Sequence, residues 1–235
     1  MRDHVRVAYR ELLAPPELAH VVRCLWVRDG TAEETIVTPD GCVDVIVRGG
    51  RAVVAGPDTG PVAVRLDAGE VVTGVRMRPG AAGAALDVPA DAVRDRRVAL
   101  EDLWGRAGRE AAARAEEDPY ALVDALRGRL AAAAPDPRVL AAAARLARMP
   151  ETPVPALAAA VGLGERQLRR RFAAAVGYGP KTFARVARFR RALALIRAGE
   201  PLATAAAAAG YADQAHMTRE LAALAGRTPA ALAPG

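Results

Sequence analysis

The first hundred residues have the pattern of short β-strands separated by turns. Three segments rich in β-branched residues carry it: VVRCLWVRDG, ETIVTPDGCVDVIVRGG and RAVVAGPDTGPVAVRLDAGEVVTGVRMRPGAAG. Within the second segment, Cys42–Val47 forms a strand that ends at Gly49-Gly50, and Asp40-Gly41 is typical of a hairpin turn. Turn residues recur at intervals of roughly 8–12 positions, which predicts a β-sandwich or β-barrel.

From about Leu100 the pattern becomes helical. The segment LEDLWGRAGREAAARAEEDPYALVDALRGRLAAAA lacks the alternation of a strand and is rich in helix formers. Ala134-Pro135-Asp136-Pro137 interrupts it, and the rest of the chain is helical again. The predicted fold class is α+β in two domains, with a β domain over residues 1–105, a helical connector over 106–136 and an all-α domain over 137–235.

The all-α region contains a weak internal repeat of two helix-turn-helix units, at about 154–177 and 201–226. The copies read LAAAVGLGERQLRRRFAAAVG and LATAAAAAGYADQAHMTRELAALAG. Between them lies PKTFARVARFRRALALIRAG, with Pro180 suited to the first position of a helix and Gly199 to its C-terminal cap. A helix from Lys181 to Arg197 is a rod of roughly 25 Å, which would hold the two units apart.

The second helix of each unit has an apolar face and an opposite face that carries arginine. The apolar faces are formed by Leu168, Phe172 and Ala175, and by Met217, Leu221 and Leu224. The opposite faces carry Arg166, Arg170 and Ala173, and Ala215, Arg219 and Ala222. Any solvated helix could show one such face, so it is the duplication that favours DNA contact. A guanidinium flanked by small residues can reach the O6 and N7 atoms of guanine.

Net charge supports a polyanionic partner for this region. Residues 150–235 hold 12 Arg and Lys against 5 Asp and Glu, whereas residues 1–149 hold 21 against 22. The positive charge of the chain therefore belongs to its C-terminal third. Arg171 falls near the edge of the apolar face, where it would meet either a phosphate or a carboxylate.

Residues 138–233 resemble the DNA-binding domain of the AraC/XylS family of transcriptional regulators. The resemblance rests on Leu157-Ala158, Gly162-Leu163, Gln167-Leu168-Arg169-Arg170, Phe172, Arg188, Ala192, Gly210-Tyr211-Ala212-Asp213-Gln214, His216, Thr218-Arg219 and Gly226-Arg227-Thr228-Pro229. It implies that both second helices enter successive major grooves on one face of double-stranded DNA. The chain departs from the family pattern at Gly164, where a capping serine or threonine is usual, and at Leu221, where phenylalanine is common.

The same resemblance implies roles for individual residues and further partners. The base-reading candidates are Arg166, Arg169, Arg170, Gln214, Ala215 and Arg219, and the candidates for contact with the DNA backbone are Arg171, Lys181, His216 and Thr218. A small-molecule effector, RNA polymerase and a second copy of the chain are the other partners that membership of this bacterial-type family implies.

The N-terminal half resembles the cupin-like domain of many such regulators, through TPDGCVDVIV, AGPDTGP, GVRMRPGAAG and LEDLWG. Only His4 and His20 occur in this half, too few for a histidine-rich metal site, so no metal and no cofactor are expected. Arg76 and Arg78 would suit an anionic effector if they pointed inward, but the outward orientation is favoured. Further expectations are that Asp40 and Asp44 are turn and edge residues, Trp26 and Trp104 core anchors, and Cys24 and Cys42 buried thiols.

The expected function is sequence-specific DNA recognition by a transcriptional regulator, with no enzymatic activity and no catalytic residues. The alternative is a cupin-like small-molecule binding protein or enzyme with a helical appendage that docks a partner. The segment MRDHVRVAYREL has charges where a signal peptide needs an apolar core, and no apolar run is long enough to span a membrane. A cytoplasmic protein without a membrane partner is therefore expected.

Overall fold

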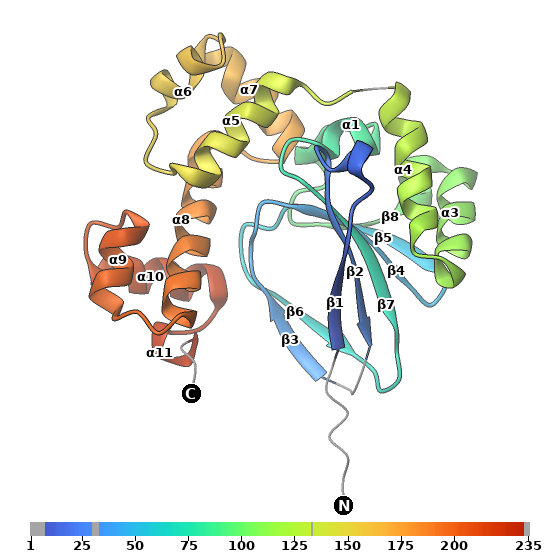
Figure 1. Ribbon diagram of the computed structural model, residues 1–235, viewed down its shortest axis with the longest axis horizontal. Helices are drawn as coiled ribbons and strands as arrows, with labels where there is room; N and C mark the ends of the chain where they lie inside the picture. Colours follow the sequence, from blue (N-terminus) through green and yellow to red (C-terminus); the bar gives the residue numbers. More distant parts are fainter. Residues whose placement is uncertain (1–7, 30–32, 133, 233–235) are drawn as a thin grey trace, which may run out of the picture.

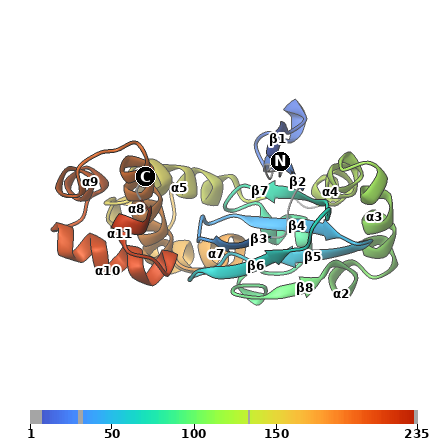
Figure 2. The same ribbon diagram turned by 90° about the horizontal axis from the view of Figure 1, so that it is seen from below.

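The computed structural model describes residues 8–29, 33–132 and 134–232. The N-terminal half contains an antiparallel six-stranded sheet in the order β1-β2-β7-β4-β5-β8 and a two-stranded sheet, β3-β6 (Figures 1 and 2). The strands are β1 Ala8–Leu13, β2 Val22–Asp29, β3 Glu33–Val37, β4 Val43–Arg48, β5 Arg51–Ala55, β6 Val62–Leu66, β7 Val72–Met77 and β8 Arg97–Ala99. His4 lies outside the described residues.

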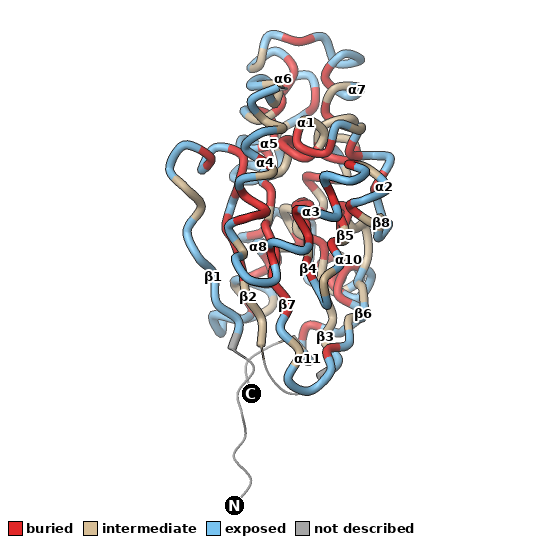
Figure 3. Tube along the Cα trace, turned by 90° about the vertical axis from the view of Figure 1, so that its right-hand side faces the viewer, coloured by how far each residue is buried: buried red, intermediate tan, exposed pale blue. Residues whose placement is uncertain are grey.

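The central strands of the large sheet have two different faces. Val43, Val45 and Val47 of β4 are buried in the main core of this half, whereas Asp44 and Ile46 point to the opposite face, over which β3 and β6 lie. In Figure 3 the burial of the central strands contrasts with the exposed edge strand β1. The two sheets therefore form the expected sandwich, open enough between them to leave a cavity.

The hairpin predicted at Asp40-Gly41 is wrong, because β3 pairs with β6 and β4 pairs with β5 and β7. Asp40-Gly41 instead carries the chain from the small sheet to the large one, and the Asp40 carboxylate accepts a hydrogen bond from the backbone N–H of Cys42 at 2.8 Å. The hairpin turn lies at Gly49-Gly50, both with positive φ, as the end of the predicted strand required. Local turn chemistry was identified correctly, but strand pairing is decided by contacts distant in the sequence.

Helices cover the other face of the large sheet. They are η1 Pro16–Leu18, α1 Ala82–Leu86, η2 Ala90–Ala92, α2 Leu100–Trp104, α3 Arg106–Glu117 and α4 Tyr120–Ala132. Ala111 of α3 and Leu122 and Leu126 of α4 share one core with the sheet valines. Residues 106–136 were predicted to form a connector, but α3 and α4 pack as part of the N-terminal half because their apolar faces complete its core.

The C-terminal half is all-α, and the expected two-part α+β class is confirmed. Its helices are α5 Pro137–Arg148, α6 Val154–Ala160, α7 Glu165–Val176, α8 Pro180–Arg197, α9 Leu202–Ala209, α10 Gln214–Ala225 and α11 Pro229–Leu232. Its buried side chains form two separate cores. The first part of α8 contributes Phe183 and Val186 to the core of the first unit, and the second part contributes Phe189 and Ile196 to that of the second.

Candidate nucleic-acid interface

The helices α7 and α10 occupy equivalent places in the two helix-turn-helix units. Each follows a turn whose glycine has a positive φ, Gly162 before α7 and Gly210 before α10. Leu168 and Phe172 of α7 are fully buried, as are Met217 and Leu221 at the same registers of α10. The predicted apolar faces are therefore confirmed, except that Ala175 is only half-buried and Val176 completes the face in its place.

The opposite faces of α7 and α10 are exposed to solvent. Arg166 and Arg170 of α7, and Ala215 and Arg219 of α10, are all exposed. Among the residues that the structure describes, no carboxylate forms an ion pair with Arg170 or Arg219. These two guanidinium groups lie two residues after the buried Leu168 and Met217, so both helices present an exposed cation at the same register.

Two other predicted base-reading residues, Arg169 and Gln214, have different surroundings from Arg170 and Arg219. Arg169 forms an exposed ion pair with Glu165 one turn earlier, at 3.3 Å. Gln214 is the first residue of α10 and is exposed. The structure does not bring the base-reading candidates of α7 together with those of α10. They form one group on each helix, because α8 separates the two units. At 1.5 Å per residue, the 18 residues of α8 span about 27 Å.

One ion pair anchors the rear of each helix to its own unit. Arg171 donates to the carboxylate of Asp136, the N-cap residue of α5, at 3.0 Å, and Glu220 accepts from Arg185 of α8 at 2.8 Å. Arg171 thus meets a carboxylate, one of the two expected partners. Asp136, Arg185 and Glu220 were not identified from the sequence; only Asp136-Pro137 carried a usable signal, since it reads as an N-cap followed by proline at the first helical position.

The N-termini of α7 and α10 are capped unequally. The Asp213 carboxylate accepts a hydrogen bond from the backbone N–H of His216 at 2.6 Å, whereas Gly164 at the start of α7 has no side chain to do so. We expect Asp213→Ala to lower the free energy of unfolding by about 1 kcal/mol. Gly164→Ser should raise it by a few tenths of a kcal/mol. Chemical denaturation of the full chain measures both changes, and equal effects of the same sign would contradict this account.

Three of the four predicted backbone contacts, Arg171, His216 and Thr218, are half-buried side chains. His216 packs edge-on against the ring of Tyr211, with centroids 5.2 Å apart, and the hydroxyl of Thr218 donates to the carbonyl oxygen of Gln214. Burial raises the pKa of the Tyr211 phenol to about 12, so it stays protonated. Lys181 is exposed in the first turn of α8.

The C-terminal end of α7 contacts the N-terminal half directly. A Cβ atom at Gly83 of α1 would lie 2.8 Å from the carbonyl oxygen of Ala174, and one at Gly177 would lie 2.2 Å from Cγ of Pro57. The guanidinium of Arg94 also donates to the Gly177 carbonyl oxygen, at 3.4 Å. The first of the two helices therefore joins both halves of the molecule.

The expectation that Arg76 and Asp44 lie outward or at an edge is wrong. Both project from central strands into a cavity of about 540 Å³ between the two sheets, where Arg76 Nε lies 3.0 Å from the Asp44 carboxylate. The indole N–H of Trp26 donates to the same carboxylate at 3.2 Å. Burial raises the pKa of the Asp44 carboxyl above its ordinary value, although Arg76 acts in the opposite direction. The alternation along each strand shows which residues share a face of the sheet. It does not show that a second sheet covers the face that carries Arg76 and Asp44.

The expected burial of both tryptophans and both cysteines is confirmed, as is the expected exposure of Arg78. Trp26, Trp104, Cys24 and Cys42 are buried, and burial raises the pKa of the Cys42 thiol well above its usual value. Arg78 is exposed, as expected, and its Nε donates to the carbonyl oxygen of Ala19 at 2.7 Å.

Within residues 8–29, 33–132 and 134–232, no group of His, Cys, Asp and Glu side chains has the geometry of a metal site. No helix in that part of the chain is long and apolar enough to cross a membrane.

Residues 157–233, which include both α7 and α10, match the family model described as a helix-turn-helix domain. These residues form a helix-turn-helix domain of the AraC type. The protein is a DNA-binding transcriptional regulator in which a β-rich domain precedes the helical DNA-binding region. Its residues 10–99 match a model described as a domain of unknown function, DUF6597.

Two solved structures of a Vibrio cholerae protein are similar to the regulator. One is apo ToxT with a single substitution, from strain SCE256, at 10% identity and a TM-score of 0.42, covering 98% of this chain and 97% of that chain. The other is ToxT at 8% identity and a TM-score of 0.41, covering 99% of this chain and 100% of that chain. No curated protein matches the regulator.

Proposed function

We propose that α7 and α10 of this regulator enter successive major grooves on one face of a DNA duplex. The observation that supports this reading is the pair Arg170 and Arg219, which are exposed at the same register of two equivalent helices and have no carboxylate partner among the described residues. A solvated helix face needs no such duplication. Successive grooves on one face are about 34 Å apart, a separation of the same order as the length of α8.

Each exposed side chain has a distinct proposed part in recognition. Arg166, Arg169 and Arg170 read bases from α7, and Gln214, Ala215 and Arg219 read them from α10. Arg169 would exchange Glu165 for DNA at little cost, because exposed ion pairs contribute only about 0–1 kcal/mol. Lys181, Thr218 and His216 would lie near phosphates. Arg171 keeps α7 in place through Asp136 and does not itself bind DNA in this proposal.

Footprinting tests the two-groove arrangement. DNA sites selected from random sequence by the full chain should contain two conserved elements about one helical turn apart. Hydroxyl-radical protection of a selected site should then fall on one face of the duplex. A single conserved element, or two elements on opposite faces, would contradict the proposal while leaving DNA binding itself intact.

The cavity between the sheets is the proposed site of a small-molecule effector. Arg190, Leu193, Ala194 and Arg197 of α8 line it together with residues of both sheets, and Arg190 donates to Asp40 at 3.1 Å. An occupant would therefore touch the helix that separates α7 from α10. This geometry offers a physical route from the regulatory domain to DNA affinity.

A ligand screen with a cavity-filling variant tests this route. Ile46→Trp would fill the cavity from β4, whereas Val71→Trp places the same indole at an exposed position outside it. We expect at least one small molecule to bind the wild-type chain and the Val71 variant but not Ile46→Trp, and to change DNA affinity by threefold or more. If no ligand is lost from Ile46→Trp, or if lost ligands leave DNA affinity unchanged, the effector site is elsewhere.

A further inference from the structure

The loop between β5 and β6, residues 56–61, lies against the C-terminal ends of both α7 and α10. Its sequence is GPDTGP. Pro57 packs so closely against Gly177, which ends α7, that a Cβ atom at this glycine would overlap the proline ring. Pro61 lies beside Gly226, which ends α10, and a Cβ atom there would lie 3.5 Å from Cγ of the proline. One loop of the N-terminal half therefore contacts the equivalent C-cap glycine of both helix-turn-helix units.

The β5–β6 loop is held rigidly by residues 93–97 of its own half. The carboxylate of Asp58 accepts two hydrogen bonds from the guanidinium of Arg97, both at 2.8 Å. Thr59 donates to the Asp95 carboxylate from its backbone N–H at 2.6 Å and from its hydroxyl at 2.9 Å. Paired bonds between a guanidinium and a carboxylate are among the stronger polar contacts, and the two prolines restrict φ at both ends of the loop.

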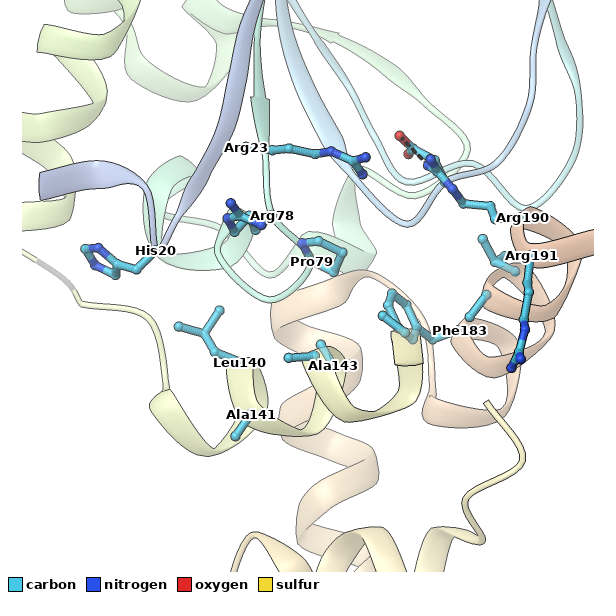
Figure 4. A pocket seen from close by; sticks show the side chains of 15 residues that line it. His20, Arg23, Arg78, Pro79, Leu140, Ala141, Ala143, Phe183, Arg190 and Arg191 are labelled. Carbon is cyan, nitrogen blue, oxygen red and sulfur yellow. Dashed lines mark ion pairs between the residues drawn. The ribbon is translucent and has the colours of Figure 1, made fainter. Parts of the chain in front are cut away.

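Around α8 the N-terminal half and the C-terminal half are less closely packed. Arg190 of α8 pairs with Asp40 of the N-terminal half, and Figure 4 shows this ion pair at the edge of a cavity of about 590 Å³. A cavity of about 540 Å³ adjoins the same pair. Each helix-turn-helix unit has its own core on a different part of α8, so a bend of α8 between the cores would move α10 relative to α7. Contact of one rigid loop with both helix ends opposes such a movement.

The length of the loop limits the distance between its two contacts. Pro57 and Pro61 are four residues apart, so at most about 14 Å of chain separates them. The contact of Pro57 with Gly177 is buried, whereas that of Pro61 with Gly226 is exposed. The end of α7 is therefore fixed on the loop, and Pro61 limits how closely the end of α10 can approach the N-terminal half.

We propose that the β5–β6 loop is a spacer that sets the separation between α7 and α10. Pro57 and Pro61 are its positioning residues, since each acts through the helix end that it contacts and neither contacts DNA. The loop thereby selects the number of base pairs between the two DNA elements. This last consequence rests on the proposed two-groove arrangement, whereas the separation itself is a property of the free protein.

A distance measurement on the free chain tests the spacer without DNA. Spin labels are attached at Gln167→Cys on α7 and Ala222→Cys on α10, both exposed positions, and double electron–electron resonance gives the distribution of distances between them. The native thiols of Cys24 and Cys42 are buried, and burial raises the pKa of both, which disfavours their reaction with the label. We expect one narrow distribution in the labelled parent chain.

Two changes at Pro61 should alter this distribution in different ways. Pro61→Gly removes the contact with α10 and should widen the distribution twofold or more. Pro61→Trp places a larger side chain against Gly226 and should shift the distribution to longer distances. The matched control is Pro16→Gly, the same substitution at an exposed proline of η1, and it should leave the distribution unchanged.

The affinity for DNA of altered spacing tests the consequence for recognition. Insertion of one base pair between the two elements of a selected site should weaken binding of the wild-type chain at least tenfold. The same insertion should weaken binding of Pro61→Gly threefold or less, because α10 can then adjust its position. A loss of stability alone would weaken binding to both DNA sites by the same factor, and Pro16→Gly should respond to the insertion as the wild-type chain does.

Several results would overturn the proposal. They are a broad distribution in the labelled parent chain, an unchanged distribution in both Pro61 variants, and equal broadening in Pro16→Gly. Equal sensitivity of the wild-type chain and Pro61→Gly to the inserted base pair would overturn the role in spacing. A single conserved element in the selected DNA would contradict the two-groove arrangement instead, and the distance measurement would still decide whether the loop positions α10. Circular dichroism melting of each variant separates loss of the contact from loss of the fold.

Discussion

Arg170→Ala is expected to remove the preference for one base pair of the DNA site, and Arg219→Ala the preference for another. A bidentate guanidinium contact contributes about 1–3 kcal/mol of discrimination between bases, which corresponds to roughly 5- to 150-fold in affinity for the preferred site. The two arginines are exposed at equivalent registers of α7 and α10, so each should affect a different element of the site. Sequencing of DNA selected by each variant measures the loss at each position.

The controls for this experiment remove charge without removing a reader. Arg114→Ala deletes one exposed arginine on α3, at the opposite end of the molecule from α10 in Figure 1. It should leave the selected sequence unchanged. Arg171→Ala should lower the stability of the first unit without changing base preference, because Arg171 is paired with Asp136. If Arg170→Ala weakens binding equally for all sequences, Arg170 contacts the DNA backbone and does not read a base.

Gly177→Ala is expected to destabilise the regulator more than any other change considered for its DNA-binding half. Gly177 ends α7 with a φ of 100°, where a side chain costs about 1–2 kcal/mol. The new Cβ would also meet Pro57 at 2.2 Å and the Ala90 carbonyl oxygen at 3.1 Å, both in the N-terminal half. Such overpacking adds about 1–3 kcal/mol. Denaturant unfolding of the full chain measures the total.

Gly162→Ala separates the two contributions to this cost. Gly162 also has a positive φ, of 65°, but a Cβ there would meet no atom within 4 Å. Gly162→Ala should therefore lower the free energy of unfolding only through the strain of a positive φ, by about 1–2 kcal/mol. The difference between the two variants reports the contact between α7 and the N-terminal half. Equal losses would show that Pro57 and Ala90 move aside without cost.

Local patterns in the chain were sufficient for the elements of the DNA-binding half. The helix ends at Pro180 and Gly199 and the inward placement of Leu168 and Met217 follow from rules that act within a few residues. The same periodicity placed Arg170 and Arg219 on exposed faces. These features were predictable because a helix specifies its own hydrogen bonds and the direction of each side chain.

Long-range packing decided what those patterns left open. Asp40-Gly41 has residue types that are typical of a hairpin turn, yet it links two sheets because β3 pairs with β6 and not with β4. Arg76 alternates correctly with Val75, but only the second sheet makes its face the inside of a cavity. Likewise, α3 and α4 joined the N-terminal core because the large sheet offers an apolar face there.

The sequence by itself determined that this protein has a β-rich half followed by two helix-turn-helix units, each with an arginine opposite its core. Only the tertiary structure decided how the halves meet: Gly177 packs against Pro57, and Asp40 pairs with Arg190. The physical reason is the distance along the sequence over which each kind of interaction acts. Periodicity and capping act over one or two turns of the chain, whereas these contacts join residues that come together only when both cores have formed.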